Sequence, residues 1–239
     1  GTWPARSMEM QAELVENGTH EKVQHASSVR FSIVSPDGDE GYPGALTVVT
    51  EFTWNDAHEL TIDYRATTDR STVINLTNHS YWNLAGAGTG DVLSHELQLM
   101  CDSALAVDDD LIPTGEIVPV ADTPLDFRQF HRIGERIDQL AATKGYDHCY
   151  AINGQAGRLR PCATVKHAAS GRVMEVLTTQ PGVQLYTGNH LDGQFSQHSG
   201  LCLETQHYPD SPNHPSFPTT RLNPGDTFHE TTVHRFSVA

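Results

Sequence analysis

The amino-acid sequence predicts an all-β protein made of antiparallel strands, arranged as a sandwich or a barrel. Many short stretches of the 239-residue chain alternate apolar and polar residues, and turns containing Gly, Pro, Asp and Asn separate them. This pattern is typical of strands joined by tight connections. Only residues 133–140 space their apolar side chains as a helix does. Because a sandwich of this length commonly folds as one unit, we expect residues 1–239 to form a single domain, with residues 1–7 as a cloning remnant.

The expected strands follow one another along the whole chain. They span residues 13–19, 29–34, 46–54, 60–66, 71–79, several short stretches within 95–120, and then 162–167, 172–179, 183–186, 200–206 and 227–238. The clearest pair is 46–54 with 60–66, because apolar residues alternate on both sides of a polar turn at 55–58. This pattern predicts an antiparallel hairpin. A loop dense in Gly, Pro and Asp precedes the hairpin at residues 35–44.

Charge and composition exclude several classes of partner. The chain has 30 acidic and 15 basic residues, a formal net charge of -15 and a pI near 5.2. Such a surface repels phosphate backbones and anionic lipids, so we expect neither nucleic acid nor a membrane as a partner. No apolar run approaches the roughly 20 residues that span a bilayer, and the first residues lack the apolar core of a secretory signal. We therefore expect a cytoplasmic protein.

The cysteines and histidines do not follow a metal-binding pattern. The cysteines, with no CxxC pair among them, are Cys101, Cys149, Cys162 and Cys202. Wide separation is typical of reduced, buried thiols rather than of a disulfide framework. The fourteen histidines include no HExxH or His-x-His motif. We therefore expect no metal site.

Ionisable and amide side chains interrupt three of the predicted strands. His79 ends a polar row on one strand, Gln184 alternates with apolar residues on another, and on a third Glu204 follows Leu201 and Leu203, which point to the opposite face. If these faces line one concave surface, a histidine, an amide and a carboxylate converge there, and Asp147 would add a second carboxylate. Each residue alone also has a structural explanation, because a strand glutamate or glutamine is usually solvated and an isolated histidine is usually a satisfied structural residue.

Asn78, Tyr81 and Trp82 surround His79 in the stretch LTNHSYWNLAG. Aromatic rings beside a polar row suit a sugar, because the C–H faces of a sugar stack on aromatic rings and its hydroxyls take directional hydrogen bonds. On the residues alone, His79 and Glu204 are therefore candidates for an acid/base pair in a sugar site.

Several longer stretches form a recognisable set. They are LTNHSYWNLAG, LIPTGEIVPV with TPLDFR after it, GYDH, PGVQLYTGN and GLCLETQHYPDSPNHPSFPTTRLNPGDTF. Together they closely resemble the aldose 1-epimerases, also called galactose mutarotases. The resemblance runs from about the loop SPDGDEGYPG to the end of the chain. It implies a galactose-mutarotase-like antiparallel β-sandwich, called a supersandwich, with an open sugar cleft.

The resemblance also implies a reaction and roles for residues. Glu204 matches the family's general base, which removes the proton from the anomeric hydroxyl, and His79 matches the general acid, which protonates the ring oxygen. Ring opening, rotation about C1–C2 and reclosure then exchange the α and β anomers of galactose, glucose or a related aldose. The reaction moves only protons, so no cofactor is implied. Asp147 and Gln184 match residues that hydrogen-bond the sugar, and the full set of substrate-binding candidates is Asp147, Gln184, Asn78, Tyr81 and Trp82.

The resemblance is incomplete toward the N-terminus. Family members usually carry a further portion with Gly-Arg…Asn-Arg and His-Gly-Gly motifs, which supply an arginine and a second histidine, and neither motif occurs here. His190 also stands where the family usually has an aromatic residue. An N-terminally truncated sandwich would expose sheet edges, so we expect a homo-oligomer that covers them. We also expect weaker sugar binding and slower ring opening, because an electrostatic contact to the ring oxygen is lost.

Two other functions remain open on the sequence. Asp147 and Glu204 could be the two carboxylates of a glycosidase if they lie roughly 5 to 10 Å apart. Alternatively, the chain could be a carbohydrate-binding module that keeps the fold without turnover, because a fold alone does not establish a function.

Overall fold

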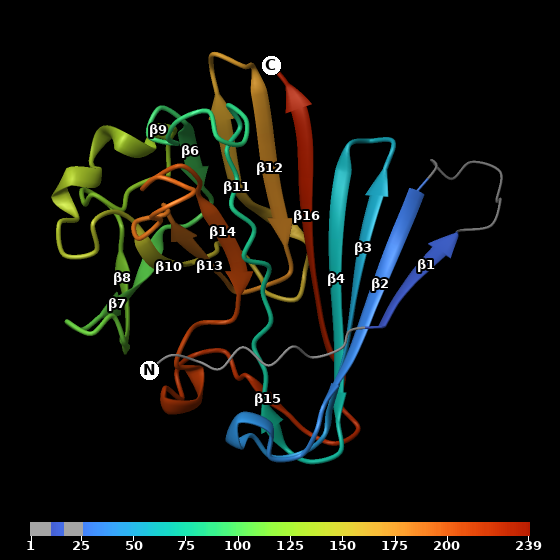
Figure 1. Cartoon of the computed structure of the whole chain (residues 1–239). Helices are drawn as coiled ribbons and strands as arrows, with labels where there is room; N and C mark the ends of the chain where they lie inside the picture. Colours follow the sequence, from blue (N-terminus) through green and yellow to red (C-terminus); the bar gives the residue numbers. More distant parts are fainter. Residues whose placement is uncertain (1–10, 17–25) are drawn as a thin grey trace. The chain divides into compact units, whose positions relative to one another are not determined.

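The computed structural model describes residues 11–16 and 26–239 (Figure 1). The chain divides into two compact units, Gly1–Ile74 with Arg221–Thr231, and Asn75–Thr220 with Thr232–Ala239. The expectation of a single domain stays a prediction, and the cloning remnant expected at residues 1–7 lies outside the described residues. Within those residues, no helix is long and apolar enough to cross a membrane.

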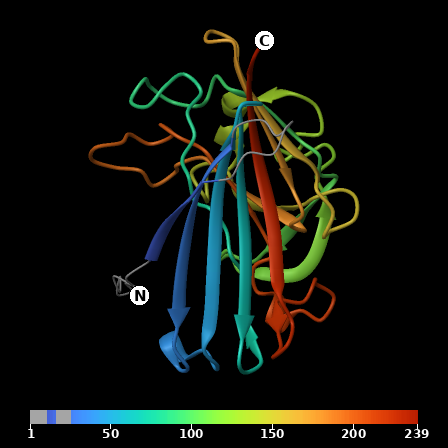
Figure 2. The ribbon, with the colours of Figure 1, turned by 90° about the vertical axis from the view of Figure 1, so that its right-hand side faces the viewer.

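The first unit is built around an antiparallel sheet. Its elements are β1 (Gln11–Glu16), β2 (Ala26–Ser35), the 3-10 turn η1 (Asp39–Gly41), β3 (Leu46–Asn55), β4 (Glu59–Thr68), the short pair β5 (Thr72–Val73) and β15 (Arg221–Leu222), and the beginning of β16 (Phe228–Val238). Strands β1 to β4 are neighbours in that order, each antiparallel to the next. Figure 2 shows β2, β3 and β4 as long strands side by side. The predicted hairpin is confirmed, because Thr50 pairs with Tyr64 and Phe52 with Ile62.

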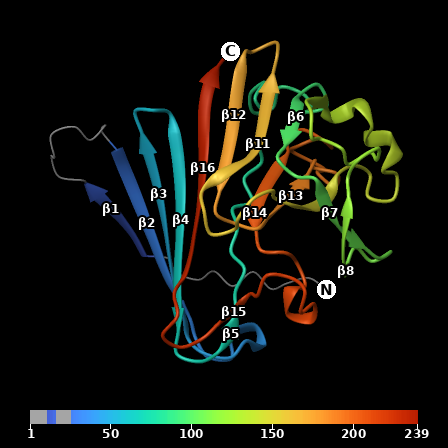
Figure 3. The ribbon, with the colours of Figure 1, turned by 180° about the vertical axis from the view of Figure 1, so that it is seen from behind.

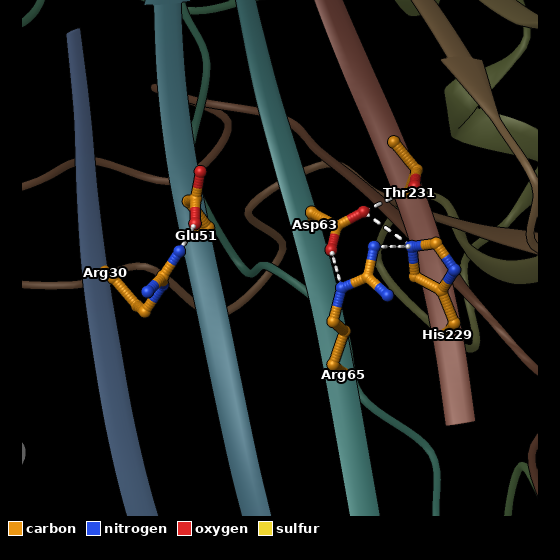
Figure 4. A network of polar contacts seen from close by, with 6 residues as sticks. All are labelled: Arg30, Glu51, Asp63, Arg65, His229 and Thr231. Carbon is orange, nitrogen blue, oxygen red and sulfur yellow. Dashed lines mark hydrogen bonds and ion pairs between the residues drawn. The ribbon is translucent and has the colours of Figure 1, made fainter. Parts of the chain in front are cut away.

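One face of this sheet carries a network of polar side chains (Figure 4). The Arg30 guanidinium donates from Nε and Nη2 to the Glu51 carboxylate at 3.0 and 2.7 Å. The Asp63 carboxylate accepts a hydrogen bond from the Thr231 hydroxyl at 2.9 Å and pairs with Arg65 at 3.0 Å. Partly exposed ion pairs contribute about 0–1 kcal/mol each, so this network marks the polar face without dominating stability.

The second unit is a sandwich of two antiparallel sheets (Figure 3). In one sheet the strand order is β16-β12-β11-β6-β9. This sheet contains the end of β16, β12 (Arg172–Thr178), β11 (Arg160–His167), β6 (Glu96–Leu99) and β9 (His131–Arg132). The other, with five strands, has the order β14-β13-β10-β7-β8, which are β14 (Cys202–Gln206), β13 (Gly182–Tyr186), β10 (Asp147–Ala151), β7 (Ser103–Val107) and β8 (Pro113–Pro119). The 3-10 turns η2 (Ile133–Glu135), η3 (Ile137–Gln139) and η4 (Ser211–Asn213) lie between strands.

Apolar side chains from both sheets of the second unit form one buried cluster. Leu97 and Val165 come from one sheet and Tyr150, Leu185 and Leu203 from the other, and all five are at most 3% exposed. Burial of a large apolar side chain contributes about 1.5–3 kcal/mol, so this core fixes the five-stranded sheet in place. The four cysteines of the chain are buried free thiols.

The strand predicted over residues 71–79 is wrong beyond its first residues, because only Thr72–Val73 is a strand. After Val73, hydrogen bonds of polar side chains take the place of backbone pairing with a neighbouring strand. Asn75 donates to the carbonyl of His207 and accepts from its N–H, both at 2.9 Å, and Thr77 donates to the carbonyl of Thr205 at 3.0 Å. These polar residues compete with the backbone for hydrogen bonds and hold the segment extended without strand pairing.

The helix predicted over residues 133–140 is also wrong. Ile133 and Ile137 are buried, as the helical spacing predicts, but each begins a separate 3-10 turn. Arg136 between the turns has a φ of -130°, which is outside the helical range and interrupts the hydrogen-bond pattern.

Candidate functional site

The register of the five-stranded sheet brings the candidate residues of three strands together. Asp147 of β10 lies opposite Tyr186 of β13, and Tyr186 lies opposite Cys202 of β14. Two residues along, Gln184 lies opposite Glu204. Because side chains two apart on a strand share a face, all five belong to one side of the sheet. The sequence expectation that Gln184 and Glu204 share a surface therefore follows from the strand pairing.

The turn before β10 requires a glycine at position 145. Gly145 has a φ of +142°, and a Cβ there would lie 2.8 Å from the Thr187 hydroxyl and even closer to the Asn189 amide oxygen. Thr187 accepts a hydrogen bond from the N–H of Tyr146 at 3.0 Å, and Asn189 donates to the carbonyl of Tyr146 at 2.9 Å. This tight contact fixes the chain directly before Asp147.

Gln180 supports the segment that carries His79. Its side chain is fully buried, and Nε2 donates to the carbonyl of Leu76 at 3.2 Å. Its Oε1 accepts from Nδ1 of His207 at 2.9 Å. Gln180 therefore ties the backbone three residues before His79 to the end of β14.

His79 and Glu204 face each other. Nε2 of His79 lies 3.4 Å from Oε1 of Glu204, with the histidine side chain 54% exposed and the glutamate side chain 11% exposed. Burial raises the pKa of the Glu204 carboxyl, His79 opposes the rise, and Asp147 adds to it. A carboxylate with a raised pKa is a stronger base, which suits proton removal near neutral pH.

Asp147 and Gln184 form a second polar pair. Nε2 of Gln184 donates to Oδ1 of Asp147 at 2.7 Å, and both side chains are partly exposed. The carboxylate and the amide each keep further acceptor or donor positions. This arrangement suits hydrogen bonds to the hydroxyl groups of a ligand.

Two tyrosines surround the imidazole of His79. The Tyr81 ring stacks on it at 5.3 Å between centroids, and the Tyr186 ring stands edge-on to it at 6.3 Å. Burial raises the pKa of the Tyr81 hydroxyl, and Cys202, Tyr186, Glu204 and Asp147 raise it further. Neither Tyr186 nor Cys202 could be assigned to the site from the sequence, because neither differs from an ordinary strand residue.

Trp82 and Asn78 have different surroundings from the other candidates. The Trp82 ring packs against His234 at 5.1 Å and Phe236 at 5.6 Å between centroids, on the apolar core. Asn78 accepts a hydrogen bond from the N–H of Ser80 at 3.2 Å, which is a local turn contact. The structure does not bring the Trp82 ring to the histidine and carboxylates, and a sugar contact by either residue stays a prediction.

In the described part of the chain, one group of side chains could hold a metal ion. Ligand atoms of His79, Cys202 and Glu204 lie within 4.8 Å of one another. His79 presents Nδ1 to Cys202 and Nε2 to Glu204, so one ion could not use both present contacts. Burial raises the pKa of the Cys202 thiol, and this disfavours the thiolate that a metal requires. The arrangement therefore suits proton exchange better than metal binding.

Comparisons with known proteins point to sugar epimerases. The family model described as aldose 1-epimerase matches residues 15–235. The galactose mutarotase of Rattus norvegicus is 48% identical over 222 residues, which cover 90% of this chain and 64% of the rat protein. The chain thus spans less than two thirds of the length of that relative.

Two crystal structures resemble the fold closely. An aldose epimerase homologue from C. elegans aligns with a TM-score of 0.83 and 29% identity, covering 95% of this chain and 69% of that one. The galactose 1-epimerase of Lactobacillus acidophilus NCFM aligns with a TM-score of 0.83 and 26% identity, covering 96% and 67%. These likenesses confirm the predicted galactose-mutarotase-like antiparallel β-sandwich.

Proposed function

Because the chain belongs to the aldose 1-epimerase family, we propose that it interconverts the α and β anomers of galactose, glucose or a related aldose. The observation that carries this proposal is the pair of His79 and Glu204, whose facing atoms lie 3.4 Å apart. Anomer exchange needs one group to remove a proton and one to supply a proton, and this pair offers both.

The reaction begins when the Glu204 carboxylate removes the proton of the anomeric hydroxyl. His79 gives a proton from Nε2 to the ring oxygen, the C1–O5 bond breaks, and the open-chain aldehyde forms. Rotation about C1–C2 turns the other face of the aldehyde toward the ring hydroxyl. Reclosure returns one proton to His79 and takes one from Glu204, so the cycle consumes no co-reactant.

The surrounding side chains bind and orient the monosaccharide. Asp147 and Gln184, joined at 2.7 Å, offer hydrogen bonds to hydroxyl groups. Tyr81 and Tyr186 offer aromatic surface to the C–H face of the ring. The His79–Glu204 pair favours anomer exchange over a glycosidase, in which Asp147 would be the partner of Glu204.

The proposal is tested by measuring exchange and binding separately. Magnetisation-transfer NMR reports exchange between galactose anomers at equilibrium, and calorimetry reports galactose binding. We expect Glu204→Gln and His79→Asn to abolish catalysed exchange while galactose still binds, and Glu175→Gln, at a partly exposed position of β12, to exchange as the wild type does. Binding without exchange in the wild type would instead identify a carbohydrate-binding module.

We also propose that the chain forms a homo-oligomer through β8. This strand ends the order of the five-stranded sheet, and it exposes Ile117 by 45% and Val118 by 37%. The loop before it exposes Leu111 by 44% and Ile112 by 50%. Edge strands with apolar side chains tend to pair with another chain.

Light scattering at micromolar concentration tests this assembly. We expect a dimer or larger species for the wild type and a monomer for Ile117→Lys, with Val238→Lys as a control at another exposed position. A wild type that is monomeric would contradict the proposed assembly.

A further inference from the structure

Cys202 is a buried polar group at the site that the proposed reaction does not use. It has no exposed surface, and its Sγ lies 3.4 Å from Nδ1 of His79, within hydrogen-bonding distance for sulfur. The thiol therefore contacts the ring nitrogen opposite the one that faces Glu204. What this contact does depends on which of the two nitrogens of His79 carries a hydrogen.

Glu204 decides the state of the first nitrogen. An ionised carboxylate only accepts hydrogen bonds. Nε2 of His79 lies 3.4 Å from Oε1 of Glu204, so this contact is favourable when Nε2 carries a hydrogen and unfavourable when it carries a lone pair. A neutral imidazole has one N–H and one acceptor nitrogen. With the hydrogen on Nε2, Nδ1 is an acceptor and is stabilised by a donor beside it.

Cys202 is in place to be that donor. Burial raises the pKa of its thiol, and Glu204 and Asp147 raise it further, so the sulfur keeps its proton. A protonated thiol is a weak donor, and within residues 26–239 its hydrogen-bond partner is Nδ1 of His79.

Packing alone does not choose the orientation of this ring. Tyr81 stacks on it and Tyr186 stands edge-on to it, and these contacts fix the plane of the imidazole. A half-turn of the ring within that plane exchanges the positions of nitrogen and carbon atoms, and the His79 side chain is 54% exposed, which leaves room for the turn. A polar contact at Nδ1 distinguishes the two orientations.

We propose that Cys202 is a positioning residue that holds neutral His79 in the orientation and tautomer with the hydrogen on Nε2. This inference rests on the proposed function, because that tautomer directs the hydrogen toward Glu204 and toward the ring oxygen of a bound sugar. With the hydrogen on Nδ1, Nε2 of the neutral ring would turn a lone pair toward the carboxylate and toward the ring oxygen, and it could donate a hydrogen bond to neither.

The first test reads the ring without any turnover. Two-bond proton–nitrogen correlation spectra of protein labelled with ¹⁵N-histidine, recorded near pH 8 without sugar, show which nitrogen of His79 is protonated and whether the other accepts a hydrogen bond. We expect Nε2 to be protonated and Nδ1 to have the shift of a hydrogen-bonded acceptor. A hydrogen on Nδ1 in the wild type would overturn the proposal.

Three variants separate the thiol contact from general packing. Cys202→Ala removes the donor, Cys202→Ser restores one, and Cys162→Ala removes an equally buried thiol from β11 in the other sheet. In Cys202→Ala we expect the Nδ1 signal to lose its acceptor shift and kcat to fall about 2- to 10-fold with little change in KM, which is the worth of one neutral hydrogen bond. Cys202→Ser should recover both readouts, and Cys162→Ala should keep both.

The two readouts can fail independently. If Cys202→Ala kept the wild-type Nδ1 shift and kcat, Cys202 would have no positioning role. If the wild type showed the expected tautomer but no catalysed exchange, the proposed function would fail, while the Nδ1 shifts of the Ala and Ser variants would still decide whether Cys202 holds the ring.

Discussion

Two buried histidines predict that acid destabilises this protein. His95 has no exposed surface and His234 is 2% exposed. Burial lowers the pKa of each from 6.5 to about 4; for His95, His167 lowers it further and Asp91 opposes the change. The perturbation is therefore a simple change of pH from about 7.5 to about 5.

The sign follows from proton binding. Between pH 6.5 and about 4, an unfolded chain binds a proton on each of these histidines while the folded chain does not. The free energy of unfolding therefore falls as the pH falls through this window. Between pH 7.5 and 5 the loss is about 2 kcal/mol for each histidine and about 4 kcal/mol for both, a large part of the roughly 5–15 kcal/mol that stabilises a typical domain.

Urea unfolding at the two pH values measures this loss, and His234→Phe isolates one half of it. Phenylalanine fills similar space against the ring of Trp82, 5.1 Å away between centroids, and cannot be protonated. We expect the variant to lose about 2 kcal/mol less than the wild type between the two pH values. Equal losses in the two proteins, or no loss in the wild type, would refute the reasoning.

Two further predictions concern the support of the segment that carries His79 and the binding of sugar at the site. Gln180→Leu removes the hydrogen bond to the carbonyl of Leu76, so it should lower the free energy of unfolding by about 1–3 kcal/mol, measured by urea unfolding. It should also lower kcat, measured by polarimetry. An unchanged kcat would mean that the segment of His79 is held in another way. Asp147→Asn removes the charge beside Gln184 while keeping an acceptor, and initial rates should show KM rising about 10-fold with a smaller change in kcat; the reverse pattern would indicate a role in proton transfer.

The hairpin could be predicted because apolar and polar residues alternate along both of its strands, and this alternation assigns each side chain to one face of the sheet. Phe52 and Ile62 each lie between polar residues, which is typical of a strand with one apolar face. The two residues lie opposite each other in the ladder. The same holds for Gln184, which lies between Val183 and Leu185, and for Glu204, which follows Leu203; the two polar residues lie opposite each other in the ladder. Where the local alternation of residues agrees with the tertiary fold, the sequence alone predicts the strand and the face of each side chain.

The segment of His79 shows why the rest could not be predicted. Its alternation is that of a strand, but Asn75 and Thr77 bond to backbone groups more than 120 positions away in the chain. Likewise Tyr81 and Trp82 are adjacent, yet the first stacks on His79 and the second packs on the core. Contacts between distant residues decided these outcomes, and no local pattern reports them.

The central claim, that Glu204 and His79 catalyse anomer exchange, is tested most directly by polarimetry of freshly dissolved α-galactose and α-glucose with wild-type protein and with Glu204→Gln. The account predicts a decay of optical rotation that is faster than the spontaneous rate with the wild type and equal to it with the variant. Decay at the spontaneous rate with both proteins would contradict the account, and equally fast decay with both would show that Glu204 is not the base.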